Sequence, residues 1–113
     1  MEQVTRPWGN YTVLLENDNY KIKKIIVNPN SRLSLQSHKH RSEHWTIVKG
    51  NAIIQVGKDK LNLTANQYAF IPKETLHRIE NNSESVVELI EVQIGDYLGE
   101  DDIVRYDDDY SRK

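Results

Sequence analysis

The chain has 113 residues, of which 37% are hydrophobic and 28% are charged, and its formal net charge is −2. This length fits one domain with a small core. The near-neutral charge provides no global field that would favour nucleic acid or an anionic membrane. Because the chain has no cysteine, a disulfide framework, a thiolate metal site and a cysteine nucleophile are all excluded. We therefore expect a single domain over residues 1–113.

The sequence has no run of apolar residues long enough to span a bilayer. Its first ten residues also lack the apolar stretch of a signal peptide. These features predict a cytoplasmic protein without a membrane or nucleic-acid partner.

Short β-rich runs alternate with turn signals along most of the chain. In order, the runs cover residues 11–15, 20–27, 32–36, 44–48, 52–56, 60–63, 68–71, 76–80 and 86–92. Strands at this spacing, with no long helical period, indicate an all-β sandwich or barrel. Gly50-Asn51 lies between two apolar runs and is typical of a tight hairpin.

Two charged segments stand apart from this pattern. Lys21, Lys23 and Lys24 follow one another in a β-rich run, and we expect them on a solvated strand edge. From about residue 96 the chain becomes acidic, with seven carboxylates and one arginine between Asp96 and Asp109. This segment is predicted to be a solvated tail, and the alternative is a segment that folds back on the barrel or on a partner.

The four histidines of the chain fall in two places. His38, His40 and His44 lie in SLQSHKHRSEHW, and His77 lies in IPKETLHRIEN. In a strand, residues two apart share a face, so Gln36 would point the same way as the first two histidines. Nitrogen and oxygen donors grouped in this way suit a borderline divalent metal, namely zinc, iron, manganese, cobalt or nickel.

Several of these segments resemble the cupin family. Glu43 followed by six residues and Gly50 fits the end of the first cupin motif, G-x5-H-x-H-x3,4-E-x6-G. The second motif, G-x5-P-x-G-x2-H-x3-N, fits Pro72, His77 and Asn81, with Asn66 and Glu74 standing in the glycine positions. The resemblance implies a double-stranded β-helix of the jelly-roll type.

A closer resemblance covers nearly the whole chain. RPWGNY, LSLQSHKHRSEHW, IPKETLHRIEN and IEVQIGDYLGEDDIVRYDDDY are similar to the C-terminal cupin domain of type II phosphomannose isomerases. In that family the domain is usually fused behind a mannose-1-phosphate guanylyltransferase. The chain has no nucleotidyltransferase segment and is too short to hold one, so guanylyltransfer by the chain itself is excluded.

The motif spacing leaves two registers for the ligands. If His38 and His40 are the first two ligands, the gap to Glu43 is one residue short of the pattern, whereas Gln36 and His38 fit it. Type I phosphomannose isomerases also place a glutamine and a histidine on their zinc. We therefore predict that four residues hold the metal, zinc first among the candidates: Gln36, His38, Glu43 and His77. His40 is left as a reserve ligand, an acid/base group or a group that hydrogen-bonds to a ligand.

The resemblance implies a metal-dependent isomerase that interconverts mannose 6-phosphate and fructose 6-phosphate through an enediol. That reaction needs a base to carry a proton between two carbons, for which His40 and Glu91 are the candidates. The phosphate needs cationic donors, and Arg6, Arg41 and Arg78 are predicted to supply them. Regular strand alternation would turn the last two away from the cavity, so they reach it only where a bulge or strand end breaks the alternation.

Other functions compete with this prediction. The chain could be a non-catalytic cupin that binds a sugar phosphate or nucleotide sugar and partners a separate mannose-1-phosphate guanylyltransferase, or a metal-dependent cupin acting on another small substrate. Exposed strand edges in a sandwich of this size also favour a homodimer.

Overall fold

The computed structural model describes residues 1–110, which form twelve β-strands and no helix. The last three residues of the predicted domain lie outside the described residues. The strands are β1 (Gln3–Arg6), β2 (Gly9–Glu16), β3 (Tyr20–Val27), β4 (Ser31–Arg32), β5 (Leu35–Ser37), β6 (Arg41–Lys49), β7 (Ala52–Val56), β8 (Asp59–Leu63), β9 (Tyr68–Ile71), β10 (His77–Asn81), β11 (Val87–Gly95) and β12 (Val104–Asp107). The predicted all-β class is confirmed.

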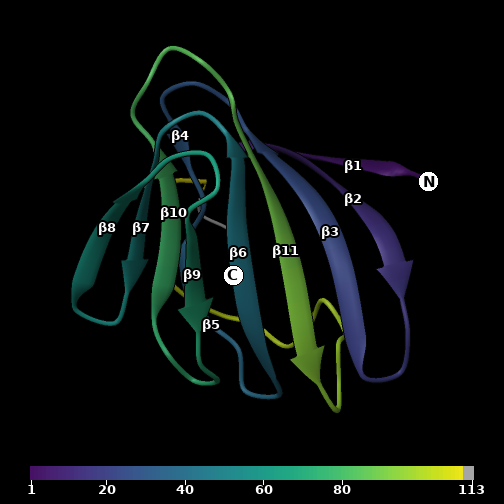
Figure 1. Cartoon of the computed structure of the whole chain (residues 1–113). Helices are drawn as coiled ribbons and strands as arrows, with labels where there is room; N and C mark the ends of the chain where they lie inside the picture. The colour runs from purple at the N-terminus through teal and green to yellow at the C-terminus, as the bar shows by residue number, and fades with distance from the viewer. Residues whose placement is uncertain (111–113) are drawn as a thin grey trace.

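The strands form two antiparallel sheets that face each other (Figure 1). The first sheet has the order β1-β2-β3-β11-β6-β9, and the second has the order β12-β5-β10-β7-β8 with β4 beside β10. Neighbouring strands are often distant in sequence, and β11, for example, lies between β3 and β6. Residues from both ends of the chain can therefore meet between the sheets.

The core lies between the two sheets and follows from the alternation of side chains along each strand. In β3 every second residue is buried, and Ile25 and Val27 on that inner face are 5% and 0% exposed. Further buried apolar residues come from both sheets: Trp45, Ile47, Ile54, Ala69, Ile71, Ile79, Val87 and Leu89. This apolar packing fills one end of the sandwich, whereas polar and charged side chains occupy the other end.

The turn at Gly50-Asn51 does not join a hairpin, and this prediction is wrong. The strand before it, β6, pairs with β9 and β11 in the first sheet, whereas the strand after it, β7, pairs with β8 and β10 in the second. Gly50 has φ +94°, and a Cβ placed on it would lie 2.6 Å from the carbonyl oxygen of Val86. Glycine is needed here because the chain crosses tightly from one sheet to the other.

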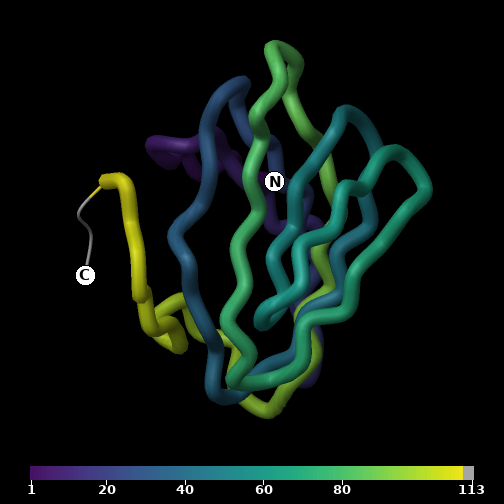
Figure 2. The backbone as a smooth tube through the Cα atoms, turned by 90° about the vertical axis from the view of Figure 1, so that its left-hand side faces the viewer, coloured from purple at the N-terminus to yellow at the C-terminus, as the bar shows by residue number. Residues whose placement is uncertain are grey.

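The C-terminal segment is not a solvated tail. Its last strand, β12, pairs with β5 at the edge of the second sheet, and Figure 2 shows this segment running beside β5. Between β11 and β12 the chain makes a turn over the mouth of the sandwich, where Leu98 and Asp102 are 8% and 9% exposed. The alternative prediction, a segment that folds back on the barrel, describes what the structure shows.

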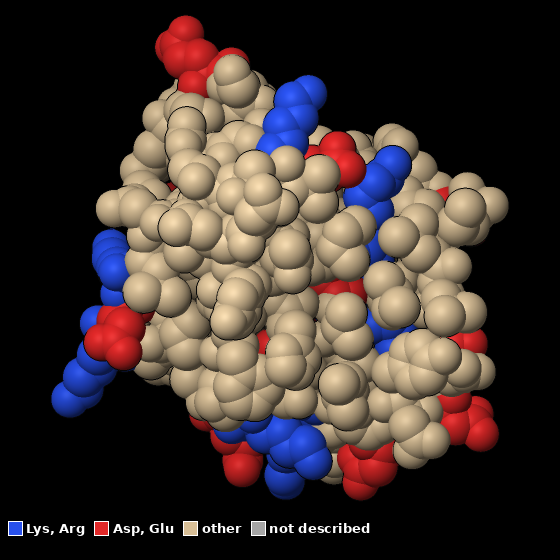
Figure 3. All heavy atoms as spheres, in the orientation of Figure 1, with Lys and Arg blue, Asp and Glu red and all other residues tan. Residues whose placement is uncertain are grey.

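The outer face of the first sheet carries exposed apolar side chains on β6, β9 and β11. Exposed fractions are 47% for Val48, 74% for Tyr68, 51% for Phe70 and 45% for Ile94. In Figure 3, which views this side, charged side chains are sparse across the middle and lie mostly toward the margin. We refer to these four residues as the apolar face.

Candidate functional site

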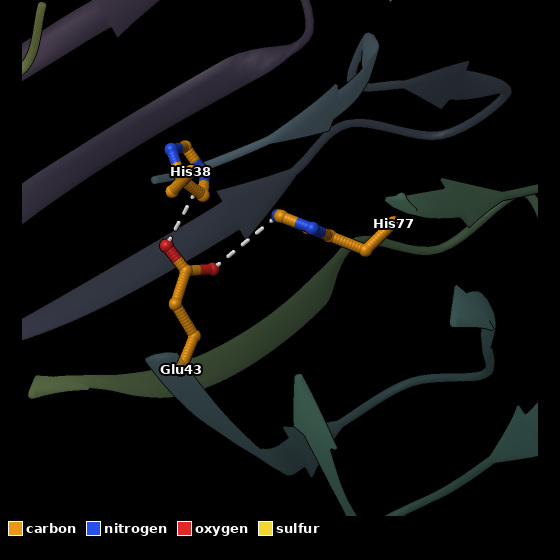
Figure 4. A group of neighbouring side chains, drawn as sticks. All are labelled: His38, Glu43 and His77. Atoms are coloured by element: carbon orange, nitrogen blue, oxygen red, sulfur yellow. Dashed lines mark ion pairs between the residues drawn. The ribbon is translucent and has the colours of Figure 1, made fainter. Parts of the chain in front are cut away.

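Glu43, His38 and His77 converge at the polar end of the sandwich. Glu43 points inward from β6, and its two carboxylate oxygens face different histidines (Figure 4). Oε2 lies 3.3 Å from Nε2 of His38, and Oε1 lies 3.6 Å from Nε2 of His77. All three side chains are at most 3% exposed. We refer to these residues as the triad.

The two histidine rings are held so that their Nε2 atoms face the carboxylate. Nδ1 of His38 lies 2.6 Å from the carbonyl oxygen of Asp102, and Nδ1 of His77 lies 2.9 Å from that of Thr75. Because a carbonyl only accepts, each Nδ1 carries the proton and donates it. In the neutral ring, Nε2 then carries a lone pair that can accept a hydrogen bond or bind a metal ion.

Burial keeps both rings neutral. It lowers the pKa of His38 to about 4, with the nearby charge of Arg41 acting in the same direction, and it also lowers the pKa of His77. The Nε2 atom of His77 is buried and has no hydrogen-bond partner among the described residues. A buried acceptor without a partner is costly, and a metal ion is one group that would satisfy it.

The geometry of the triad fits a divalent transition metal. The donor atoms lie within 4.8 Å of one another. Two ligands on a tetrahedral ion at 2.0–2.1 Å are separated by about 3.3 Å, which is close to the 3.3 and 3.6 Å measured from Glu43 to the two rings. Neutral imidazoles and a carboxylate are the ligand types that zinc and its neighbours take.

Arg41 is the cation that balances the triad in the structure. Its Nε donates to Oε2 of Glu43 at 2.7 Å, and its Nη2 lies 3.3 Å from Nε2 of His38. Nη1 of Arg41 is buried and makes no hydrogen bond in the described part of the chain. The guanidinium therefore neutralises the Oε2 side of the Glu43 carboxylate.

A left-handed turn fixes the backbone of His38. Glu74 has φ +62°, and its N–H donates to the carbonyl oxygen of His38 at 2.7 Å. Asn66 has φ +75°. These are the residues that replace the glycines of the second motif, so the left-handed conformations that glycine favours are kept here by other residues.

Gln36 and His40 occupy different surroundings. Gln36 lines the cleft beside the triad and lies directly opposite His77 in the pairing of β5 with β10, so the two share a face. His40 does not join the triad: its side chain is 46% exposed and its Nδ1 lies 3.8 Å from Asp96. The reason is that β5 ends at Ser37. His40 lies beyond the strand, so alternation does not place it on the face of His38.

A cleft of about 170 Å³ opens beside the triad at the polar end of the sandwich. It is lined by four cationic side chains, Arg6, Lys23, Arg41 and Arg105, and by two carboxylates, Glu91 and Glu100. The excess of cations favours an anionic ligand. The volume is below the roughly 300–1,000 Å³ of pockets for drug-sized ligands, so the cleft suits one small polar group.

Glu91 is fully engaged within the cleft wall. Its two oxygens accept hydrogen bonds from Nε1 of Trp45 at 2.8 Å and from Nε2 of Gln93 at 2.7 Å. Burial raises the pKa of Glu91, and the negative charge of Glu43 adds to this effect. Trp45 is 2% exposed, so it belongs to the core rather than to the surface of the cleft.

The three arginines predicted to bind phosphate are placed differently. Arg6 lines the cleft, and its guanidinium carbon lies 5.4 Å from the ring centroid of Tyr11. Arg41 reaches the cleft because β6 begins with it, so it shares the inner face with Glu43 two residues later. Arg78 is turned away from the cleft and donates to the carbonyl oxygens of Leu33 and Asp107.

Several residues of the site were not anticipated from the sequence. Lys21 and Lys23 are 5% and 4% exposed on the inner face of β3, so the prediction of a solvated edge is wrong for both. Asp102 and Arg105 come from the C-terminal segment. The alternation of β3 was the available signal, because the same parity that buries Ile25 buries both lysines.

A two-sheet sandwich of this topology, with histidines and a glutamate gathered at one end, defines a cupin. Solved structures with the same fold include an RmlC-like cupin from Shewanella frigidimarina, with TM-score 0.78 and 22% identity over 88% of this chain and 86% of that chain. KdgF from a Halomonas species has TM-score 0.80 and 12% identity, covering 89% of this chain and 90% of that chain. The predicted double-stranded β-helix is confirmed.

The chain belongs to the family described as "Mannose-6-phosphate isomerase C-terminal", whose model matches residues 1–108. It is 48% identical over 110 residues to the xanthan biosynthesis protein XanB of Xanthomonas campestris, covering 97% of this chain and 24% of that protein. It is 44% identical over 103 residues to a mannose-1-phosphate guanylyltransferase of Salmonella muenchen, covering 91% of this chain and 22% of that protein. The alginate biosynthesis protein AlgA of Pseudomonas aeruginosa is 46% identical over 110 residues, with 97% and 23% covered.

The prediction that this chain is a mannose-6-phosphate isomerase is wrong. The relatives are named for guanylyltransfer or for polysaccharide biosynthesis, and the chain spans less than a quarter of their length. Of the two predicted bases, only Glu91 lines the cleft. His40 lies outside it, and both oxygens of Glu91 already accept hydrogen bonds.

Within residues 1–110, no helix has the length and apolar character needed to cross a membrane. The names of the relatives place similar domains in proteins of xanthan and alginate biosynthesis.

Proposed function

We propose that this chain is a non-catalytic, metal-holding cupin that binds a phosphorylated mannose ligand, either a sugar phosphate or a nucleotide sugar, and partners a mannose-1-phosphate guanylyltransferase. The observation that carries the proposal is the cation-rich cleft beside the triad, in a domain whose relatives include a mannose-1-phosphate guanylyltransferase. The cleft recognises the anionic end of the ligand, and the partner supplies the chemistry.

The cleft supports an anionic sugar ligand for two reasons. Arg6 and Arg105 make no ion pair among the described residues, so their charges are available to a phosphate. The cleft wall also presents polar groups, among them Ser34 and Gln36, that can hydrogen-bond sugar hydroxyls. The small volume favours the sugar-phosphate part of the ligand over a complete nucleotide.

The triad would hold a metal ion, for which zinc is our choice. His38, Glu43 and His77 would be its ligands, and Gln36, which is paired opposite His77, offers a further oxygen donor on the same face. When bound, zinc supplies a Lewis-acidic positive charge at the inner end of the cleft. That charge would add to those of the cationic side chains that line the cleft. Arg41 must then give up its contact with Nε2 of His38.

Calorimetric titration of the zinc-loaded chain tests the function directly. The probes are mannose 1-phosphate, mannose 6-phosphate and GDP-mannose, with unphosphorylated mannose as the control. We expect at least one phosphorylated probe to bind and mannose itself not to bind. If none of the three phosphorylated compounds binds, the proposal is overturned.

Elemental analysis tests the metal centre with a matched pair of histidine variants. His77→Ala removes the unpartnered Nε2 of the triad and should lose stoichiometric zinc. His44→Ala removes an exposed ring that packs on Phe70 outside the site, and it should keep the metal. Equal zinc content in the two variants would remove His77 from the site.

The apolar face supports a protein partner. Exposed apolar side chains clustered on one face of a sheet mark an interaction surface, and Tyr68 and Phe70 are its most exposed aromatic residues. We assign the guanylyltransferase to this face, since a domain of this kind makes up less than a quarter of the relatives and is joined to the rest of their chain. Phe70→Glu should abolish co-purification with a mannose-1-phosphate guanylyltransferase, whereas Leu61→Glu, an exposed apolar position on β8, should not. Loss of a homodimer instead, seen by light scattering, would assign the face to a second copy.

A further inference from the structure

Two lysines are buried on the inner side of β3, and one of them, Lys23, lines the cleft. Lys21 and Lys23 are 5% and 4% exposed, and they continue the face that carries the core residues Ile25 and Val27. Burying an ammonium group is costly unless an anion is paired with it. Two of them on neighbouring positions of one face therefore indicate an anion site.

One carboxylate oxygen serves both lysines. Oε2 of Glu100 lies 2.8 Å from Nζ of Lys23 and 3.3 Å from Nζ of Lys21. Lys21 also donates to the carbonyl oxygen of Leu98 at 2.9 Å. The charge and hydrogen bond of Lys23 lower the pKa of Glu100 even though burial opposes ionisation. Glu100 is thus an anion bound by its own chain.

This internal anion sits at the surface on a segment without regular structure. The Glu100 side chain is 50% exposed, while the two lysines beneath it are 6% and 5% exposed. Glu100 lies between β11 and β12, and we refer to residues 96–103 of this connection as the strap. The carboxylate can therefore move out into water without disturbing a strand.

Two further cationic side chains, Arg6 and Arg105, line the same cleft as Lys23 and Glu100 and form no ion pair among the described residues. Nε of Arg105 is buried and has no hydrogen-bond partner in the described part of the chain, and Arg6 lines the same cleft. Nζ of Lys23 lies 4.1 Å from the ring centroid of Tyr11, which covers one side of the ammonium. Four cationic side chains line the cleft against the two carboxylates of Glu91 and Glu100, so the cations are in excess. A phosphate carries more charge and three acceptor oxygens.

We infer that Lys21, Lys23 and Arg105 form a phosphate subsite that the Glu100 carboxylate occupies in the absence of ligand. The phosphate of the ligand replaces the carboxylate, and the strap moves away from the cleft as it binds. This inference rests on the proposed function, since it names the part of the cleft that takes the phosphate. The Glu100 carboxylate competes with the ligand for Lys21 and Lys23, so only a ligand with more negative charge than a carboxylate displaces it.

The strap also reaches the triad. The carbonyl oxygen of Asp102 accepts a hydrogen bond from Nδ1 of His38. The Asp102 carboxylate accepts hydrogen bonds from the backbone N–H groups of Lys39 and His40. Glu100 and Asp102 are two residues apart on one short segment. Displacement of Glu100 by phosphate would therefore also move the backbone of Asp102, whose carbonyl oxygen positions the His38 ring.

Titration of inorganic phosphate into the full chain tests this inference. We expect Glu100→Gln to bind phosphate at least five-fold more tightly than the wild type, because the internal competitor is gone. Glu16→Gln is the matched control, since Glu16 also pairs with Lys21, at 3.6 Å, but is 61% exposed and does not line the cleft. It should change the affinity less than two-fold. Lys23→Met should weaken binding at least ten-fold.

Hydrogen exchange provides a second measurement that does not depend on any variant folding. Phosphate should speed amide exchange in the strap of the wild-type chain while leaving β11 unchanged. Equal phosphate affinity of the wild type and Glu100→Gln, or exchange in the strap that is unchanged or slower with phosphate, overturns the inference and leaves the proposed function standing. Failure of every phosphorylated mannose probe to bind either protein overturns the proposed function as well.

Discussion

Replacing Glu74 by glycine should stabilise the fold, although no contact is gained. Glu74 is exposed, adopts φ +62°, and makes no side-chain hydrogen bond or ion pair among the described residues. Its side chain therefore contributes strain without a compensating interaction. Glycine adopts the left-handed conformation freely, and the N–H that holds the carbonyl oxygen of His38 is kept.

The size of the effect follows from two opposing terms. A side chain in the left-handed region costs about 1–2 kcal/mol, and the greater freedom of glycine in the unfolded chain takes back about 0.4–1 kcal/mol. The net gain is about 0.5–1 kcal/mol. With an unfolding entropy of about 2.1 cal/mol/K per residue, the 113 residues give about 0.24 kcal/mol/K. The expected rise in Tm is therefore about 2–4 °C.

Thermal unfolding followed by circular dichroism measures this shift, with a chelator present so that metal binding does not contribute. Glu84→Gly is the control, because Glu84 is exposed in the loop before β11 and does not have a positive φ. That variant should lower Tm, since glycine only adds freedom to the unfolded chain. A fall in Tm for Glu74→Gly as large as the fall for Glu84→Gly would refute the reasoning.

Three further predictions concern the motif residues and the triad. Asn81→Ala should lower the free energy of unfolding in urea by about 3 kcal/mol. The reason is that this fully buried amide donates hydrogen bonds to the carbonyl oxygens of Val27, Asn28 and Ser85. An unchanged urea midpoint would contradict this. Metal-free protein should lose stability as pH falls from about 6.5 toward the pKa of about 4 for His38, because the histidine takes up its proton at a higher pH in the unfolded chain than in the folded one. Urea titrations at several pH values measure this loss, and His38→Asn should reduce the dependence of the free energy of unfolding on pH. Arg41→Gln should raise zinc affinity about ten-fold by removing a like charge beside the triad, and a competition titration that shows weaker binding would disprove it.

The sequence predicted the strands better than their partners. Alternation and turn residues located nine runs that become strands, because both signals are local. They did not show that the turn at Gly50 leads into the other sheet, because that outcome depends on the long-range pairing of β6 with β11. The run at residues 32–36 is divided between β4 and β5, and nothing in its alternation marks the break.

The candidate site was predictable as far as spacing and residue chemistry extend. The motifs predict Glu43, His38 and His77 as ligands, and the structure brings these three residues together. Strand alternation predicts His40 on the same face as His38, but the strand ends at Ser37, so the alternation does not extend to His40. Lys21 and Lys23 were missed because lysine is usually exposed, and only the fold supplies the Glu100 that makes their burial tolerable.

The bond between His38 and Asp102 sets an order of events during folding. It joins residues 64 positions apart in the sequence, so its formation waits for a long loop to close. Pairings at such separations make β proteins slow to fold. On the ribosome, the residues of the triad emerge well before the carbonyl group that orients one of its rings. In the proposed function, a metal ion would be held with full affinity only after this carbonyl group is in place, so a nascent chain ending before residue 102 should bind zinc only weakly.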